Sequence, residues 1–89
     1  MKRRINMNEQ FYLFQFNDDS TYEMTCGISC KDALWEMAKY TNTSSELLHK
    51  ALKGFGENDV EDLVDLYNRF SWKRIENIYI VKEKIYGDM

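Results

Sequence analysis

The clearest hydrophobic pattern in the chain runs from Asn58 to Phe70. Its apolar residues recur every three or four positions, so a helix would gather them on one side, in an arc of roughly 160°. These residues are Val60, Leu63, Val64, Leu66, Tyr67 and Phe70. The carboxylates of Glu61, Asp62 and Asp65 point the other way. With Asn58 as its cap and Glu61 three residues later, the segment is predicted to form a helix with a core face and an acidic outer face.

Two strands are predicted near the start of the chain. Phe11 to Phe16 is an aromatic run that is apolar on both faces, and the turn-forming residues 17–20 follow it. Thr21 to Cys26 then alternates between apolar and polar residues. The apolar positions are Tyr22, Met24 and Cys26. Aromatic enrichment, strict alternation and a short connection together predict a β-hairpin.

The next segment predicts a first helix. Ser29 and Asp32 form a capping-box-like pair, so we expect the helix to start here and to run to about Thr41. Trp35 falls on the flank of this helix and is expected to be only partly buried. The apolar face holds Cys30, Ala33, Leu34, Met37, Ala38 and Thr41.

A second, shorter helix is predicted before the acidic one. Thr43 and Glu46 form its capping box. Gly54 and Gly56 are expected to end it, because glycine tolerates the left-handed backbone found just past many helices. Its apolar side holds Leu47, Leu48, Ala51, Leu52 and Phe55.

The β-branched and aromatic residues from Ile75 to about Glu83 predict one C-terminal strand, which reaches Tyr86 at most. The predicted order is therefore strand, strand, helix, helix, helix, strand (ββαααβ). It indicates an α+β fold, a small two-layer domain with helices on one face of an antiparallel sheet. We expect a single domain over residues 9–86, a flexible basic arm over 1–8 and a short tail over 87–89.

Length and charge narrow the function. The 89 residues are 44% hydrophobic, which suits one domain with its own core. A net charge of −3 argues against a nucleic-acid binder that works through overall charge. No apolar run resembles a signal peptide or a membrane span of ~20 residues, so we expect a cytoplasmic protein that does not engage a membrane. Met7 is an alternative start to Met1.

No residue pattern predicts catalysis, a metal site or a cofactor. Cys26 and Cys30 lack two further ligands for a structural metal, and His49 is the only other soft donor. In a reducing cytoplasm both cysteines are expected to stay free thiols in the core, although the strand-to-helix turn would allow a disulfide. No nucleophile motif accompanies His49, and no glycine-rich phosphate loop is present. We therefore expect a non-enzymatic protein.

The acidic residues of the third helix are the first candidate for a binding surface. Carboxylates near a helix start interact favourably with its macrodipole, at about 0.3–1 kcal/mol each, which explains Glu57 and Asp59 well and Glu61 in part. The same effect explains Asp65, two turns in, poorly. Either this face is simply solvated, or Glu61, Asp62 and Asp65 form a negative ridge that binds a protein partner with a basic surface.

The second candidate is the segment from Arg69 to Arg74, in which cations alternate with aromatic residues. This chemistry is used to grip phosphates and to stack bases. Two interpretations are open. Phe70 and Trp72 could anchor the helix-to-strand junction in the core. Alternatively, Arg69, Trp72, Lys73 and Arg74 could bind nucleic acid, with help from the basic N-terminal arm, in a nucleic-acid-binding or regulatory protein.

In type, the chain resembles many small phage and mobile-element proteins. It is short, rich in residues with AT-rich codons, and without a catalytic motif. Anti-CRISPR proteins are among these, and they are generally non-enzymatic and act by binding. The resemblance implies an inhibitor of a host defence system, which would act here through the acidic helix face, and it assigns no residue by itself. A homodimer through a sheet edge is a further possibility, because a three-stranded sheet leaves two open edges.

Overall fold

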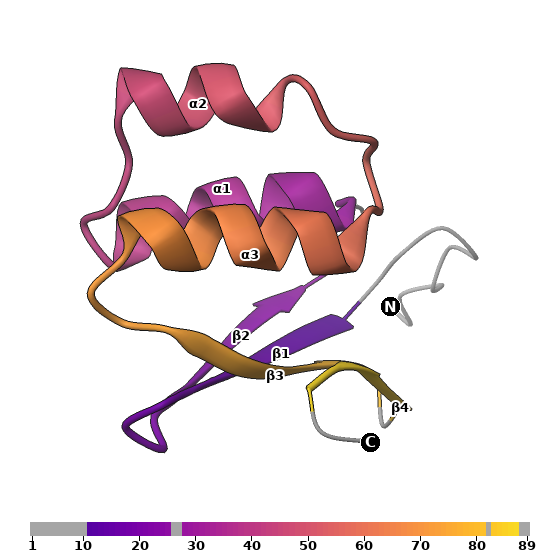
Figure 1. The fold of residues 1–89 in the computed structure, drawn as a ribbon. Helices are drawn as coiled ribbons and strands as arrows, with labels where there is room; N and C mark the ends of the chain where they lie inside the picture. The colour runs from indigo at the N-terminus through magenta and orange to yellow at the C-terminus, as the bar shows by residue number, and fades with distance from the viewer. Residues whose placement is uncertain (1–10, 26–27, 82, 88–89) are drawn as a thin grey trace, which may run out of the picture.

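The computed structural model describes residues 11–25, 28–81 and 83–87. Its elements are β1 (Phe11–Phe16), β2 (Thr21–Thr25), α1 (Cys30–Tyr40), α2 (Glu46–Leu52), α3 (Val60–Phe70), β3 (Ile75–Ile80) and β4 (Glu83–Tyr86). The strands form one antiparallel sheet in the order β2-β1-β3-β4. Figure 1 shows α1 and α3 over one face of this sheet and α2 beyond them, farthest from the sheet. The predicted α+β class, with helices on one face of an antiparallel sheet, is confirmed.

The C-terminal segment forms two strands where one was predicted. Val81 follows β3 with a φ of 58°, and β4 then begins at Glu83 and pairs back on β3. The backbone N–H of Val81 donates a hydrogen bond to the carbonyl oxygen of Phe11 at 3.0 Å. A positive φ is unusual for a β-branched residue, so Val81 carries no sequence signal for a turn. The turn adds a fourth strand and makes β4 one edge of the sheet.

The core is built on β1, the strand between β2 and β3. Tyr12, Phe14 and Phe16 alternate along its helix-facing side and are all buried. The rings of Tyr12 and Phe14 stack with their centroids 6.0 Å apart. The same buried cluster contains Cys30, Ala33, Leu34, Met37, Ala38, Leu48, Leu52, Leu63, Val64, Tyr67, Ile75 and Ile78. The predicted apolar face of α1 is thus confirmed.

The start of α1 is as predicted, because the hydroxyl oxygen of Ser29 accepts a hydrogen bond from the backbone N–H of Asp32 at 3.2 Å.

The predicted cap of α3 is wrong. This helix begins at Val60, and Asn58 lies outside it. The side-chain oxygen of Asn58 instead accepts a hydrogen bond from the backbone N–H of Cys30 at 3.1 Å. Asn58 therefore joins the starts of α1 and α3, which lie at the same end of the domain (Figure 1).

The predicted cap of α2 is also wrong. Ser45 caps this helix, and its hydroxyl oxygen accepts a hydrogen bond from the backbone N–H of Leu48 at 3.1 Å. Thr43 lies too far before the first turn, and its hydroxyl group is used elsewhere. Gly54 and Gly56 follow the helix without the left-handed backbone that was expected of them.

A network of four hydroxyl groups joins the ends of α1 and α3. Thr41 and Tyr67 share a hydrogen bond of 2.6 Å between their hydroxyl oxygens, and Thr41 and Thr43 share one of 3.0 Å. Thr43 donates to Ser71 at 3.1 Å, and the hydroxyl oxygens of Ser71 and Tyr67 lie 3.3 Å apart. Because every member has a partner, the network can be buried without the cost of an unpaired polar group.

Two residues that were assigned to the core are exposed. The side chain of Leu47 is 71% exposed and that of Phe70 is 39% exposed. The short helix α2 meets the rest of the domain through a narrow stripe, which Leu48 and Leu52 fill. Phe70 lies in the last turn of α3, on the flank of its apolar arc. The buried stripe of α3 is consequently narrower than the sequence indicated.

Among the described residues, α1 and α3 are the longest helices, with 11 residues each. A helix that crosses a bilayer needs ~20 residues. None of the helices in this part of the chain is long and apolar enough to do so. The predicted arm over residues 1–8 lies outside the described residues, as do residues 88 and 89 of the predicted tail.

Candidate functional site

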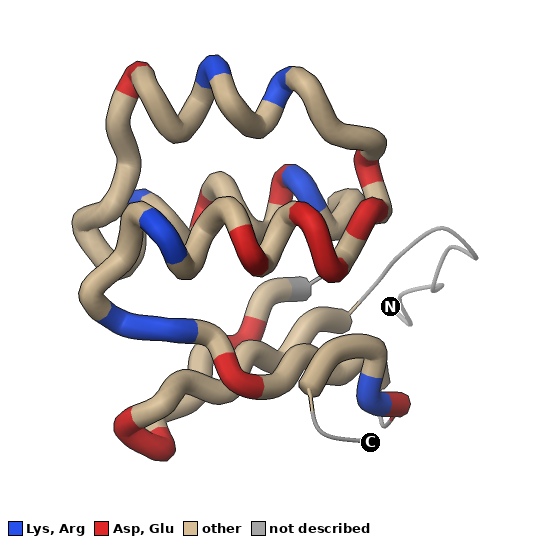
Figure 2. The backbone as a smooth tube through the Cα atoms, viewed as in Figure 1, with Lys and Arg blue, Asp and Glu red and all other residues tan. Residues whose placement is uncertain are grey.

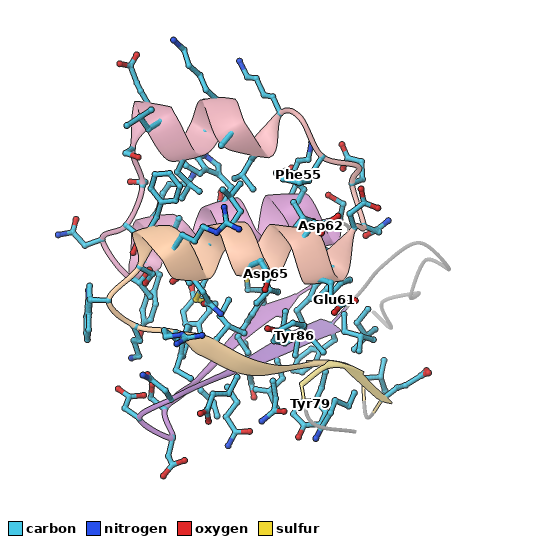
Figure 3. The ribbon with its side chains drawn as sticks, in the orientation of Figure 1. Phe55, Glu61, Asp62, Asp65, Tyr79 and Tyr86 are labelled. Atoms are coloured by element: carbon cyan, nitrogen blue, oxygen red, sulfur yellow. The ribbon has the colours of Figure 1, made fainter. Side chains whose placement is uncertain are left out.

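The acidic face of α3 consists of Glu61, Asp62 and Asp65, and all three side chains are exposed. Because α3 begins at Val60, Glu61 and Asp62 stand in its first turn. The macrodipole therefore stabilises the carboxylates of Glu61 and Asp62, and it acts also on that of Asp59, the residue just before the helix. Asp65 lies beyond the first turn, so its position needs another explanation. Figure 3 shows Glu61 and Asp65 on the side of α3 that faces β3 and β4, and Asp62 higher, toward α2.

A shallow cleft of about 740 Å³ lies between the start of α3 and the β3–β4 hairpin. It is lined by Glu61, Arg74, Ile75, Glu76, Asn77, Lys84, Ile85, Tyr86 and Gly87. Tyr86 lies below Glu61 in Figure 3. Burial raises the pKa of the Tyr86 phenol, the carboxylates of Asp65 and Glu61 raise it further, and Arg74 partly opposes them. The carboxylates of α3 therefore act electrostatically on the floor of this cleft.

A second cleft of about 380 Å³ adjoins the first and is lined by Asp65, Asn68, Arg69 and Arg74. Arg74 borders both. The amide group of Asn68 holds the start of β3 here: its NH₂ donates to the carbonyl oxygen of Ile75 at 3.2 Å, and its oxygen accepts from the N–H of Ile75 at 2.9 Å. The structure thus brings one residue of the predicted acidic surface, Asp65, and two of the predicted basic-aromatic one, Arg69 and Arg74, to one side of α3.

The remaining residues of the basic-aromatic segment differ in their exposure to solvent. Trp72 is 75% exposed, so the interpretation that Phe70 and Trp72 anchor the helix-to-strand junction in the core is wrong. Ser71, between them, is the buried residue of this turn. Its hydroxyl group bonds to both the N–H and the carbonyl oxygen of Lys73, at 3.1 and 2.9 Å. Ser71 faces inward, and the aromatic side chains on either side of it, Phe70 and Trp72, are exposed to solvent.

The side chain of Lys73 is less available to a binding partner than those of Trp72 and Arg74. Its side chain is only 15% exposed, and its ammonium group lies 3.5 Å from the Asp18 carboxylate and 4.9 Å from the centre of the Phe16 ring. Hydrogen bonds from Ser20 are the main cause that lowers the pKa of Asp18, and Lys73 adds to them. Lys73 therefore ties the first hairpin to the start of β3, and Arg69 and Arg74 are the cations left facing solvent.

Within the described residues, no group of acidic, histidine and cysteine side chains could hold a metal ion. Cys30 is a free, buried thiol, and burial raises its pKa to about 12. Cys26 lies outside the described residues.

The imidazole of His49 stacks on Trp35, with ring centroids 4.7 Å apart, so it packs α2 against α1. Trp35 is half-buried, as expected.

Sequence reasoning missed Tyr86 and Asn68 as parts of the site. Tyr86 reaches the cleft only because the chain turns at Val81, and Asn68 stands between a core residue and a surface residue with no pattern of its own.

No protein-family model matches the chain, and searches of the curated proteins and of the solved structures find no match either. The function is therefore inferred from the exposed charges of α3, the adjoining clefts and Trp72.

Proposed function

We propose that this chain is a small, non-enzymatic binding module that attaches to a basic surface of a protein partner through the acidic face of α3. The setting we propose is that of the phage and mobile-element proteins that it resembles in type: inhibition of a host defence protein in the cytoplasm, by covering a basic surface that this protein needs. The partner surface would neutralise Glu61, Asp62 and Asp65 together.

One observation carries this proposal. The ion pairs formed among the described residues, Lys39 with Glu36 and Lys73 with Asp18, involve none of the three carboxylates. Their side chains are thus exposed and form no ion pair within this part of the chain, although Arg69 and Arg74 line a cleft with Asp65. Charges arranged in this way mainly raise the rate and the specificity of association with a surface of opposite sign.

Charge reversal tests the proposal. In the variant with Glu61, Asp62 and Asp65 all changed to Lys, loss of three close charge pairs at about 1.5 kcal/mol each should weaken partner binding by about 10³-fold. Affinity purification of tagged protein from host lysate, followed by calorimetric titration of the captured protein, measures this. Asp65→Lys alone should also weaken binding, although less. The stability of this variant should change little, because residue 65 lies beyond the first turn of α3.

The matched control reverses three exposed carboxylates elsewhere, Glu23, Glu36 and Glu46, and so changes the net charge by the same amount. This control should capture the same partner with unchanged affinity. Circular dichroism should show both variants folded. Equal binding by wild type and by the α3 variant would remove the acidic face from consideration.

A second candidate function is binding of single-stranded nucleic acid through Arg69, Trp72 and Arg74. The observation that favours it is the exposure of Trp72. An exposed indole beside two exposed arginines, which form no ion pair within the described residues, offers a base-stacking platform with nearby phosphate contacts. The net charge of −3 favours the first candidate, since most of the surface would repel phosphates.

A fluorescence titration with a single-stranded oligonucleotide at low salt tests this second candidate. Binding should quench the fluorescence of Trp72. The logarithm of the binding constant should fall with the logarithm of the salt concentration, with a slope of roughly −1.4 for two phosphate contacts. Trp72→Ala should abolish the quenching, and Trp35→Phe should retain it, because Trp35 is half-buried against His49. A flat titration of the wild type would exclude this function.

A further inference from the structure

The outward side of α3 is divided by charge along its length. Asp62 and Asp65 lie within its first six residues and Arg69 in its last turn, and Arg74 follows just before β3. All four side chains are exposed. Figure 2 shows the acidic positions from the start of α3 to its middle, and the basic ones near its end and on the segment that leads into β3. We refer to these four residues as the charge-split face.

The length of the helix sets the distance between the acidic and the basic side chains. Asp62 and Arg69 are seven residues apart, which is ~10 Å along a helix with a rise of 1.5 Å per residue. The negative and positive ends are therefore separate enough for each to meet a different group on a partner. None of the four side chains belongs to an ion pair formed among the described residues.

A face of this kind is complementary to a copy of itself that has been rotated by 180°. In a two-fold interface, if residue i contacts residue j of the second copy, then j contacts i. With two α3 helices antiparallel, the acidic half of each meets the basic half of the other. The helix macrodipoles also oppose one another in this arrangement, which is favourable. A parallel arrangement would set carboxylate against carboxylate.

We propose that a second copy of this chain docks antiparallel on the charge-split face, with the α3 helices related by a two-fold axis between Asp65 and Arg69. Asp65 of each copy then approaches Arg69 of the other, and Asp62 approaches Arg74. The proposal uses two carboxylates of the proposed function, so self-association and binding of the basic partner exclude each other. One helix face covers less than the ~800 Å² per partner of a standard interface, so the dimer is weak and a tighter partner displaces it.

A charge-swap experiment tests this arrangement. One variant carries D62K and D65K, and the other carries R69E and R74E. Each variant alone presents like charges to its copy, so sedimentation velocity at low salt should show self-association weakened by at least about tenfold. An equimolar mixture should associate again, because the all-positive face of the first variant meets the all-negative face of the second. Wild type should associate with rising concentration and lose this at 1 M salt, where the Debye length falls to ~3 Å.

Two further variants separate this proposal from the proposed function. The chain that carries all four changes keeps a self-complementary face, so it should self-associate as the wild type does and fail to bind a basic partner. The control that swaps E36K with K39E on α1 alters an exposed ion pair and should behave as the wild type in both assays. A wild type that stays monomeric at all concentrations at low salt, or a mixture that fails to associate, would overturn the proposal.

Discussion

Replacing Phe14 with alanine is expected to lower the free energy of unfolding by about 3–5 kcal/mol, the usual cost of removing a buried aromatic side chain and leaving a cavity. Phe14 is fully buried on the central strand, beneath the helices, and stacks on Tyr12. Since small domains are stable by only about 5–15 kcal/mol, this one change removes much of the stability. Urea unfolding followed by circular dichroism measures the loss.

Phe11 offers a matched control for this prediction. It lies on the same strand, faces the other side of the sheet and is 38% exposed, so Phe11→Ala should cost much less, about 1 kcal/mol or below. If Phe14→Ala does not fold, Phe14→Leu keeps most of the volume and should show an intermediate loss. Equal losses at positions 11 and 14 would contradict the burial of one face of β1.

The second large effect is expected at Asn68. Asn68→Ala removes both hydrogen bonds that its amide makes to the backbone of Ile75. Two partly buried backbone groups are then left without partners at about 1–3 kcal/mol each, so the free energy of unfolding should fall by roughly 2–4 kcal/mol. Asn68→Asp keeps the acceptor for the N–H of Ile75 and sets a carboxylate against its carbonyl oxygen, so it should not rescue stability. Chemical denaturation is again the measurement.

Asn77 provides the comparison for Asn68. Its side chain donates to the amide oxygen of Gln15 at 2.8 Å, a bond between two side chains that water can replace. Asn77→Ala should therefore cost only about 0.5–1.5 kcal/mol. Similar losses for Asn68→Ala and Asn77→Ala would mean that the bridge from α3 to β3 is not a special support of the second cleft.

Local patterns in the sequence were enough for most of the elements. The first hairpin, α1 and α3 follow from alternation, from apolar spacing and from the cap at Ser29, which all act within a few residues. The cap of α2 could not be chosen in this way. Thr43 and Ser45 both have the chemistry of a cap, and only the contact of Thr43 with Thr41 and Ser71 removes it from competition.

Exposure of the charged site residues was also predictable, and Glu61, Asp62, Asp65, Arg69 and Arg74 all face solvent. The shape of the site was not. The cleft needs Tyr86 on β4, and the strand exists because Val81 adopts a left-handed backbone that its side chain disfavours. Tertiary contacts outside the local window decide such a turn. The exposure of Trp72 likewise depends on Ser71 facing inward.

The place of β1 in the middle of the sheet has a consequence for the order in which the chain is made. One edge of β1 pairs at once with β2, and its other edge waits for β3, where Gln15 and Asn77 meet across 62 residues. At roughly 5–20 residues per second, a ribosome takes ~3–12 s to synthesise that interval. For this time the nascent hairpin carries an open, aromatic edge. A chaperone or another chain has its best access to the protein before β3 emerges.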